Sequence, residues 1–138
     1  MRRFVALLTV VLLTACTNEI DQSTRPSSVV GTYQLRSYGG RSLPAVVSSD
    51  AGGVTEVTSG ELVIGSDNSW SETRNYRFTT TGSSQTASFV YTGSWTYVRD
   101  QAYMLFNLPS LQLQFTGTAA GRSVTLSMSD GSTVIYSH

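Results

Sequence analysis

The sequence contains no lysine, one cysteine and one histidine, and only 13% of its 138 residues are charged. All nine basic residues are arginines, and two of them lie at positions 2 and 3. The others are scattered along the chain, so no basic stripe is available to neutralise the phosphates of DNA or RNA. The shortage of positive charge therefore argues against a nucleic-acid-binding function.

The single cysteine and the single histidine restrict the chemistry further. Because Cys16 is the single cysteine, an intrachain disulfide and a CxxC-type metal or redox site are excluded. His138 is the final residue, where chains are usually frayed, and any Cys–His or Ser–His–Asp arrangement would need it. No spacing typical of a glycosidase pair or a calcium loop occurs among the loop carboxylates Asp50, Glu56, Glu61 and Asp67. We therefore expect no enzyme activity, no metal site and no cofactor.

Long apolar runs are also absent, apart from one segment from Phe4 to Leu13. This segment is too short to cross a bilayer comfortably, which takes about 20 residues. Two arginines precede it, and the small residue Ala15 follows it directly before Cys16. Positive charge, a short apolar segment and a small residue at the cleavage point are typical of a secretory signal peptide. We therefore assign residues 1–15 to a signal peptide.

The residues Leu13, Thr14, Ala15 and Cys16 resemble the lipobox of bacterial lipoproteins. The resemblance implies cleavage before Cys16 and attachment of acyl chains such as palmitate to this residue, which would anchor the protein to a membrane. Thr17 stands where an aspartate usually retains such lipoproteins at the inner membrane. The resemblance therefore implies the outer membrane, facing the periplasm. The alternative is an ordinary secretory peptide with an incidental cysteine.

The part of the chain after Cys16 divides into two regions. Residues 16–28 are polar, with the isolated aliphatic residue Ile20, and we expect a flexible tether there. Residues 29–138 have the length of a single domain. Serine, threonine and glycine are abundant beside 40% apolar residues, a mixture that favours short strands over helices.

The domain opens with a strand, because Gly31, Tyr33 and Leu35 share one face and polar residues share the other. Further alternating segments follow, with turns expected at 39–40, 48–53, 65–68, 81–84, 100–101, 107–110, 119–122 and 130–131. Gly60 indicates a bulge, and Asp130 with Gly131 indicates a type I′ hairpin. About eight short strands with turns at regular spacing predict an all-β fold. Because the connections are hairpin-sized, they favour an antiparallel up-and-down barrel over a Greek-key sandwich.

The domain contains several short motifs. They are Gly31-Thr32-Tyr33, Leu35, Gly39-Gly40, Leu43-Pro44, Gly60 to Ile64, Asp67 to Trp70, Gly93 to Tyr97, and the last hairpin ending in Tyr136. Together they resemble the motifs of small bacterial lipocalin-like domains of the calycin type. The resemblance implies a lipocalin-like barrel over residues 29–138. It also implies a binding protein for a small apolar or amphipathic ligand.

The segment from Ser69 to Thr79 carries the main candidate site. Its even positions share one face, and period-two alternation turns that face inward. The candidate ligand-binding residues are Trp70, Glu72, Arg74 and Tyr76 from this segment, with Tyr91 and Trp95 from the next. Glu72 and Arg74 could anchor a polar head group, or could be paired with each other or solvated near a rim. The aromatic residues could line a cavity or fill the interior.

Two functions follow from these observations. The first is a lipid-anchored envelope protein that binds a small apolar or amphipathic ligand inside the barrel. The alternative is a packed barrel whose loops contact an envelope protein or inhibit a periplasmic protease. An internal cavity lined by Trp70, Tyr76 and Trp95 would favour the first function.

Overall fold

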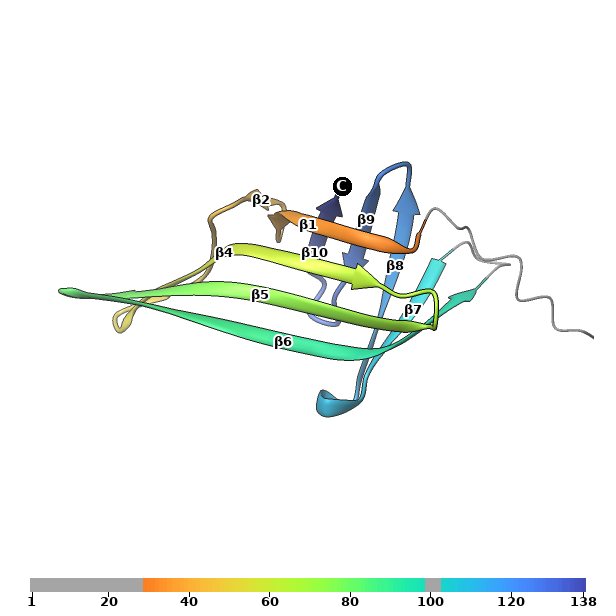
Figure 1. The fold of residues 1–138 in the computed structure, drawn as a ribbon. Helices are drawn as coiled ribbons and strands as arrows, with labels where there is room; N and C mark the ends of the chain where they lie inside the picture. Colours follow the sequence, from red (N-terminus) through yellow and green to blue (C-terminus); the bar gives the residue numbers. More distant parts are fainter. Residues whose placement is uncertain (1–28, 99–102) are drawn as a thin grey trace, which may run out of the picture.

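A computed structural model describes residues 29–98 and 103–138 of the chain. Eight strands of this part close into an antiparallel β-barrel (Figure 1). The barrel strands are β1 (Gly31–Tyr38), β4 (Gly53–Ile64), β5 (Ser69–Thr80), β6 (Ser83–Val98), β7 (Tyr103–Leu108), β8 (Leu113–Ala120), β9 (Ser123–Ser127) and β10 (Thr133–Ser137). The predicted all-β fold and closed barrel of about eight strands are confirmed. The expected signal peptide, the tether and Cys16 lie outside the described residues.

The strands follow one another around the barrel in chain order. From β4 to β10 each strand pairs with the next, and β10 pairs with β1. The ring closes because Gly31–Gln34 of β1 also pair with Glu61–Ile64 of β4. Between these two strands, β2 (Arg41–Ser42) and β3 (Ala45–Asp50) pair with the far ends of β1 and β4, outside the closed ring. The connectivity is therefore up-and-down, except that β2 and β3 are inserted between β1 and β4.

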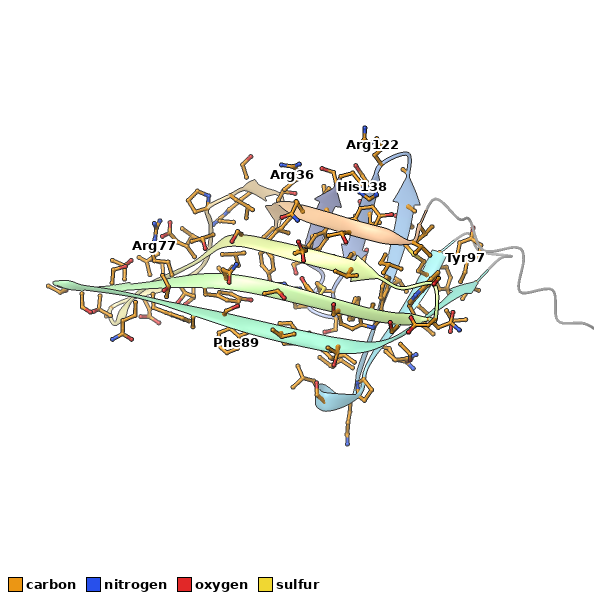
Figure 2. All side chains as sticks on the ribbon, viewed as in Figure 1. Arg36, Arg77, Phe89, Tyr97, Arg122 and His138 are labelled. Atoms are coloured by element: carbon orange, nitrogen blue, oxygen red, sulfur yellow. The ribbon has the colours of Figure 1, made fainter. Side chains whose placement is uncertain are left out.

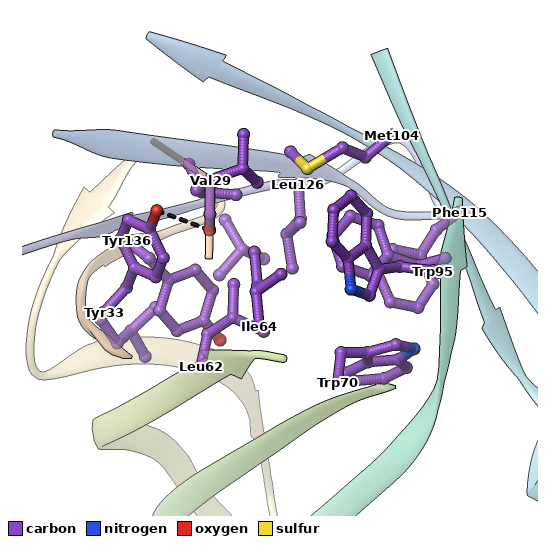
Figure 3. Packing of buried hydrophobic residues seen from close by; sticks show 14 of the residues in the cluster. Val29, Tyr33, Leu62, Ile64, Trp70, Trp95, Met104, Phe115, Leu126 and Tyr136 are labelled. Atoms are coloured by element: carbon purple, nitrogen blue, oxygen red, sulfur yellow. Dashed lines mark hydrogen bonds between the residues drawn. The ribbon is translucent and has the colours of Figure 1, made fainter. Parts of the chain in front are cut away.

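One end of the barrel is filled with side chains (Figure 3). The Tyr33 hydroxyl donates a hydrogen bond to the carbonyl of Val29 (2.8 Å), and the indole N–H of Trp95 donates to the carbonyl of Gly65 (3.0 Å). The remaining core residues at this end are apolar and almost fully buried, among them Ile64, Met104, Val124 and Leu126. Tight packing of this kind leaves no room for a ligand at this end of the barrel.

Three expected turns are shorter than the sequence indicated. The segment 48–53 was expected to break the chain, but β3 continues to Asp50 and only residues 51–52 form the turn. Likewise the turn expected at 81–84 contains only Thr81 and Gly82, and the turn expected at 119–122 contains only Gly121 and Arg122. Serine and threonine fit a pleated edge strand as well as they fit a turn, so composition alone made the turns at 48–53 and 81–84 too long.

Two local predictions were wrong. Asp130 and Gly131 do not form a two-residue type I′ turn, because only Gly131 has a positive φ (82°) and the connection spans residues 128–132. Within it, the Met128 N–H donates to the carbonyl of Ser132 (2.9 Å). The bulge expected at Gly60 lies instead between Val57 and Ser59. Gly60 serves close packing, since a Cβ there would lie 2.9 Å from the carbonyl oxygen of Thr73.

Strands β5 and β6 extend well beyond β7, their neighbour on the β6 side. All of β5 pairs with β6, but β7 pairs only with Ser94–Val98 of β6. The part of the hairpin farthest from β7, with the first half of β4 paired along β5 and β3 paired along β4, therefore projects as an arm, which narrows to the tip on the left in Figure 1. The arginines lie mainly outside, as Figure 2 shows for Arg36, Arg77 and Arg122.

Gly93 marks the point where β6 leaves β7. A Cβ at this position would lie 1.8 Å from the carbonyl oxygen of Asn107 and 2.8 Å from Nε1 of Trp70. The same carbonyl accepts a hydrogen bond from the Trp70 indole (3.1 Å). Glycine is therefore needed here because a main-chain oxygen occupies the space of a side chain.

We expect Gly93→Ala to lower the free energy of unfolding by about 3 kcal/mol, since backbone atoms must move to admit the methyl group. Urea denaturation followed by far-ultraviolet circular dichroism measures this change. Gly52→Ala is the matched control, because its new Cβ would meet only the Asp50 carboxylate, at 3.1 Å. Equal stability of the two variants would contradict the close approach at Gly93.

Candidate functional site

A cavity of about 270 Å³ lies at the end of the barrel opposite the packed core. Strand β5 contributes Trp70, Glu72, Arg74 and Tyr76 to its wall, and β6 contributes Tyr91. These residues come from alternating positions of two paired strands, so they face the same side of the sheet. Period-two alternation is thus the property of the sequence that brings them together.

The facing wall is apolar and comes from the other side of the barrel. It is formed by the end of β7, the 3₁₀ helix η3 (Pro109–Leu111), the start of β8 and the connection between β9 and β10. Its apolar residues are Leu108, Leu111, Leu113, Phe115 and Met128. Leu111 is 55% exposed and Leu113 is also exposed, so solvent reaches the cavity past these two side chains.

Glu72 and Arg74 form a buried ion pair at the polar side of the cavity. Their side chains are two residues apart on β5, and only 2% and 5% of their surfaces are exposed. Nε of Arg74 donates to Oε1 of Glu72, and Nη2 donates to Oε2 (2.9 Å). Two parallel hydrogen bonds of this kind fix the orientation of both groups. The pair accounts for both charges on the cavity wall, so the wall has no net charge.

Tyr136 from β10 completes this buried cluster. Its hydroxyl donates a hydrogen bond to Oε1 of Glu72, and the tyrosine itself is fully buried. Burial raises the pKa of Tyr136 well above its usual value, and the nearby Glu72 carboxylate raises it further. The phenol therefore stays protonated over the ordinary pH range and keeps the hydrogen that it donates to Glu72.

Two tyrosine rings cover the Arg74 guanidinium. Its central carbon lies 5.2 Å from the ring centre of Tyr38 and 5.7 Å from that of Tyr91. Both distances allow cation–π attraction. Burial acts to lower the pKa of Arg74, but the charge and hydrogen bonds of Glu72 outweigh it and raise the pKa above its usual value. Arg74 is therefore a permanent cation held by one carboxylate and two aromatic rings.

Five of the six residues predicted from the sequence line this cavity: Trp70, Glu72, Arg74, Tyr76 and Tyr91. The exception is Trp95, which belongs to the packed end of the barrel and is buried among core residues. Its indole bonds to a main-chain carbonyl there and does not reach the cavity. The alternation along β6 placed Trp95 on the correct face but could not tell at which end of the barrel it lies.

Sequence reasoning missed several residues of the site. Tyr38 and Tyr136 lie at ends of strands distant in sequence, and neither was singled out as a partner of the charged pair. The apolar wall was also missed, although Leu111 and Leu113 belong to a clean alternation of apolar and polar residues. That pattern, just after the Pro109 interruption, was the available signal for a rim of the cavity.

The described residues give no indication of a metal centre. In residues 29–98 and 103–138 no group of three or more His, Cys, Asp or Glu side chains is placed to hold an ion. His138, expected to be frayed, packs against Tyr33 with ring centres 4.1 Å apart. Its backbone N–H donates a hydrogen bond to the carbonyl of Arg122 (3.1 Å). This histidine therefore has a structural setting at the packed end, away from the cavity.

Comparison of the chain with models of protein families, with curated protein sequences and with solved structures found no match. Across the described residues, no helix has the length and apolar character needed to cross a membrane.

We expect Glu72→Gln to lower the free energy of unfolding by about 3–5 kcal/mol, because it leaves Arg74 buried without a counter-charge. The glutamine oxygen can still accept the Tyr136 hydrogen bond, so the loss reports mainly the charge. Adding Arg74→Met removes the stranded charge and should restore most of the stability. Urea denaturation measures all three proteins. A double variant no more stable than the single one would contradict this account of the pair.

Proposed function

We propose that this protein is a lipocalin-like, lipid-anchored binding protein of the bacterial envelope that takes up a small amphipathic molecule in its barrel. The cavity beside the Glu72–Arg74 pair is the observation that carries the proposal. Ligand sites are usually apolar hollows with a few fixed polar groups, and this hollow has that composition. Its volume of about 270 Å³ lies just below the usual range, which favours a small ligand.

The charge of the wall narrows the class of ligand. Glu72 and Arg74 neutralise each other, so a charged ligand would lose its hydration without gaining a counter-ion. The tyrosine residues Tyr38, Tyr76 and Tyr91 and the Gln114 amide offer neutral polar groups beside the apolar wall. This arrangement suits an uncharged molecule with an aromatic or aliphatic body and one or two hydroxyl, carbonyl or amide groups.

The location belongs to the same proposal and is supported by the sequence at the N-terminus. We propose that Cys16 carries the acyl chains and that residues 16–28 tether the barrel to the periplasmic face of the outer membrane. The support is the lipobox-like segment ending at Cys16, followed by Thr17. A barrel held at a lipid surface would meet amphipathic molecules at a high local concentration.

The alternative, a packed barrel that contacts an envelope protein or inhibits a protease, has less support. Of the exposed large apolar side chains, Leu111 and Leu113 line the cavity and are explained by it, and the others lie on strands, not in loops. An enzymatic function also has little support. The Glu72–Arg74 pair is engaged with itself and with Tyr136, which suits a fixed wall better than proton transfer.

We expect the purified protein to bind the neutral probe N-phenylnaphthylamine more tightly than its anionic relative anilinonaphthalene sulfonate. Leu111→Arg should weaken binding of the neutral probe by at least about tenfold, because it places a long charged side chain at the mouth of the cavity. Probe fluorescence titrations measure both affinities.

Ile135→Arg provides the matched control, because Ile135 is a similarly apolar, exposed residue on β10 that does not line the cavity. It should leave the affinity unchanged. Equal affinities for the wild type and the Leu111 variant would rule out the cavity as the binding site. Native mass spectrometry of the protein extracted from its own host in mild detergent would then identify any retained natural ligand.

The lipid anchor is tested separately. We expect the full-length chain expressed in a Gram-negative host to partition into a detergent phase, and Cys16→Ser to move it into the aqueous phase. Thr17→Asp should leave the partition unchanged but shift the protein from the outer-membrane to the inner-membrane fraction. Phase partition and membrane fractionation with immunoblotting measure these results. A Cys16→Ser variant that stays in the detergent phase would show that the anchor lies elsewhere.

A further inference from the structure

The outer edge of β6 is free over most of its length. Strand β7 covers only Ser94–Val98, and within residues 29–98 and 103–138 no strand pairs with the outer edge of Ser83–Gly93. This free segment is about twice as long as a typical strand of five or six residues. It forms the lower border of the projecting arm in Figure 1. A row of unpaired backbone groups is a template for a further strand.

The direction of the backbone groups identifies which residues are available. The N–H of Trp95 donates to the carbonyl of Asn68 (2.8 Å), so odd-numbered residues of β6 point their backbone groups toward β5. The pairing of β5 with β6 has no register shift. Even-numbered residues therefore point their N–H and C=O groups outward. The four that lie farthest from β7 are Ser84, Thr86, Ser88 and Val90.

This edge lacks the features that usually prevent pairing. Natural edge strands are protected by charged residues, proline, bulges or short length. Between Arg77 and Arg99 the chain contains no charged residue and no proline, and β6 pairs without a bulge. Val90 is 65% exposed and Phe89 is 45% exposed on opposite faces of the strand. The edge is thus uncharged, carries one exposed apolar side chain on each face, and is open to pairing with a further strand.

We propose that the β6 edges of two copies of this chain pair with each other as antiparallel strands. The two-fold axis of such a pair stands perpendicular to the sheet, so each edge must be compatible with its own reverse. An uncharged edge meets this condition, because no like charges come to lie opposite one another. A charged peptide or protein strand would gain no complementary charge from this edge.

The register follows from the positions that point outward. With Ala87 of each copy on the axis, Ser84 pairs with Val90 of the partner subunit and Thr86 pairs with Ser88 of the partner subunit. About eight hydrogen bonds form, because each of the four outward residues gives one N–H and one C=O. The small Ala87 side chains meet at the closest position, where bulky residues would collide. Phe89 lies on the same face and is covered across the new strand pair.

The pairing can be tested on the purified full chain in mild detergent by sedimentation velocity. We expect the wild type to be a dimer and Ser88→Pro to be a monomer with an unchanged circular dichroism spectrum. Proline removes an N–H that only the second copy uses, so the barrel itself should tolerate it. Ser88→Ala keeps the N–H and should remain a dimer. A monomeric wild type, or a Ser88→Pro dimer, would overturn the proposal.

Disulfide trapping tests the register even where the proline variant fails to fold. We expect Ala87→Cys to form a covalent dimer under mild oxidation, since the two thiols face each other across the axis. Val90→Cys should form far less covalent dimer, although Val90 is more exposed than Ala87. In the proposed register the two Val90 residues of the dimer lie far from each other. The wild type, with Cys16 alone, controls for the native thiol. Equal trapping at positions 87 and 90 would indicate random collision and would overturn the register.

Discussion

Closure of the barrel depends on strand β1, which pairs on one edge with β10 and on the other with β4. Only the first residues of β1 reach β4, from Gly31 to Gln34. Without this short ladder the sheet would be open and would expose an edge on β4 and another on β1. The tightly packed end of the barrel lies beside this junction, with Tyr33 of β1 buried against its neighbours. The hydrogen bonds that close the ring and the apolar core thus stabilise the same end.

The opposite end differs because its strands differ in length. Strands β5 and β6 continue far past the point where β7 ends at Leu108. Side chains from β7 and β8 therefore cannot interdigitate with those of the longer pair beyond Gly93. A hollow remains there, bounded by Trp70 and Tyr91 on one side and by Leu113 on the other. The cavity is thus a consequence of strand lengths more than of side-chain size.

The sequence predicts the fold well because both the alternation and the turns are local. Alternation from Trp70 to Phe78 was enough to place Glu72 and Arg74 on the inner face, and both are buried. Their partner Tyr136 could not be predicted, because it approaches from β10 only after the ring closes. The prediction that Trp95 lines the cavity was wrong for a related reason. Which end of a barrel a residue occupies depends on register across several strands, and local pattern does not contain that information.

The free edge of β6 and the cavity have the same origin. A longer β7 would cover the edge past Ser94, but it would also bring side chains into the space beside Tyr91. A barrel of fully matched strands would therefore have neither an open hollow nor a free strand. Pairing of two β6 edges allows the hollow to exist without a free edge. The exposed N–H and C=O groups of β6 then form hydrogen bonds with a second copy instead of with a longer β7. The hollow can then persist without leaving a long, uncharged edge open to indiscriminate pairing.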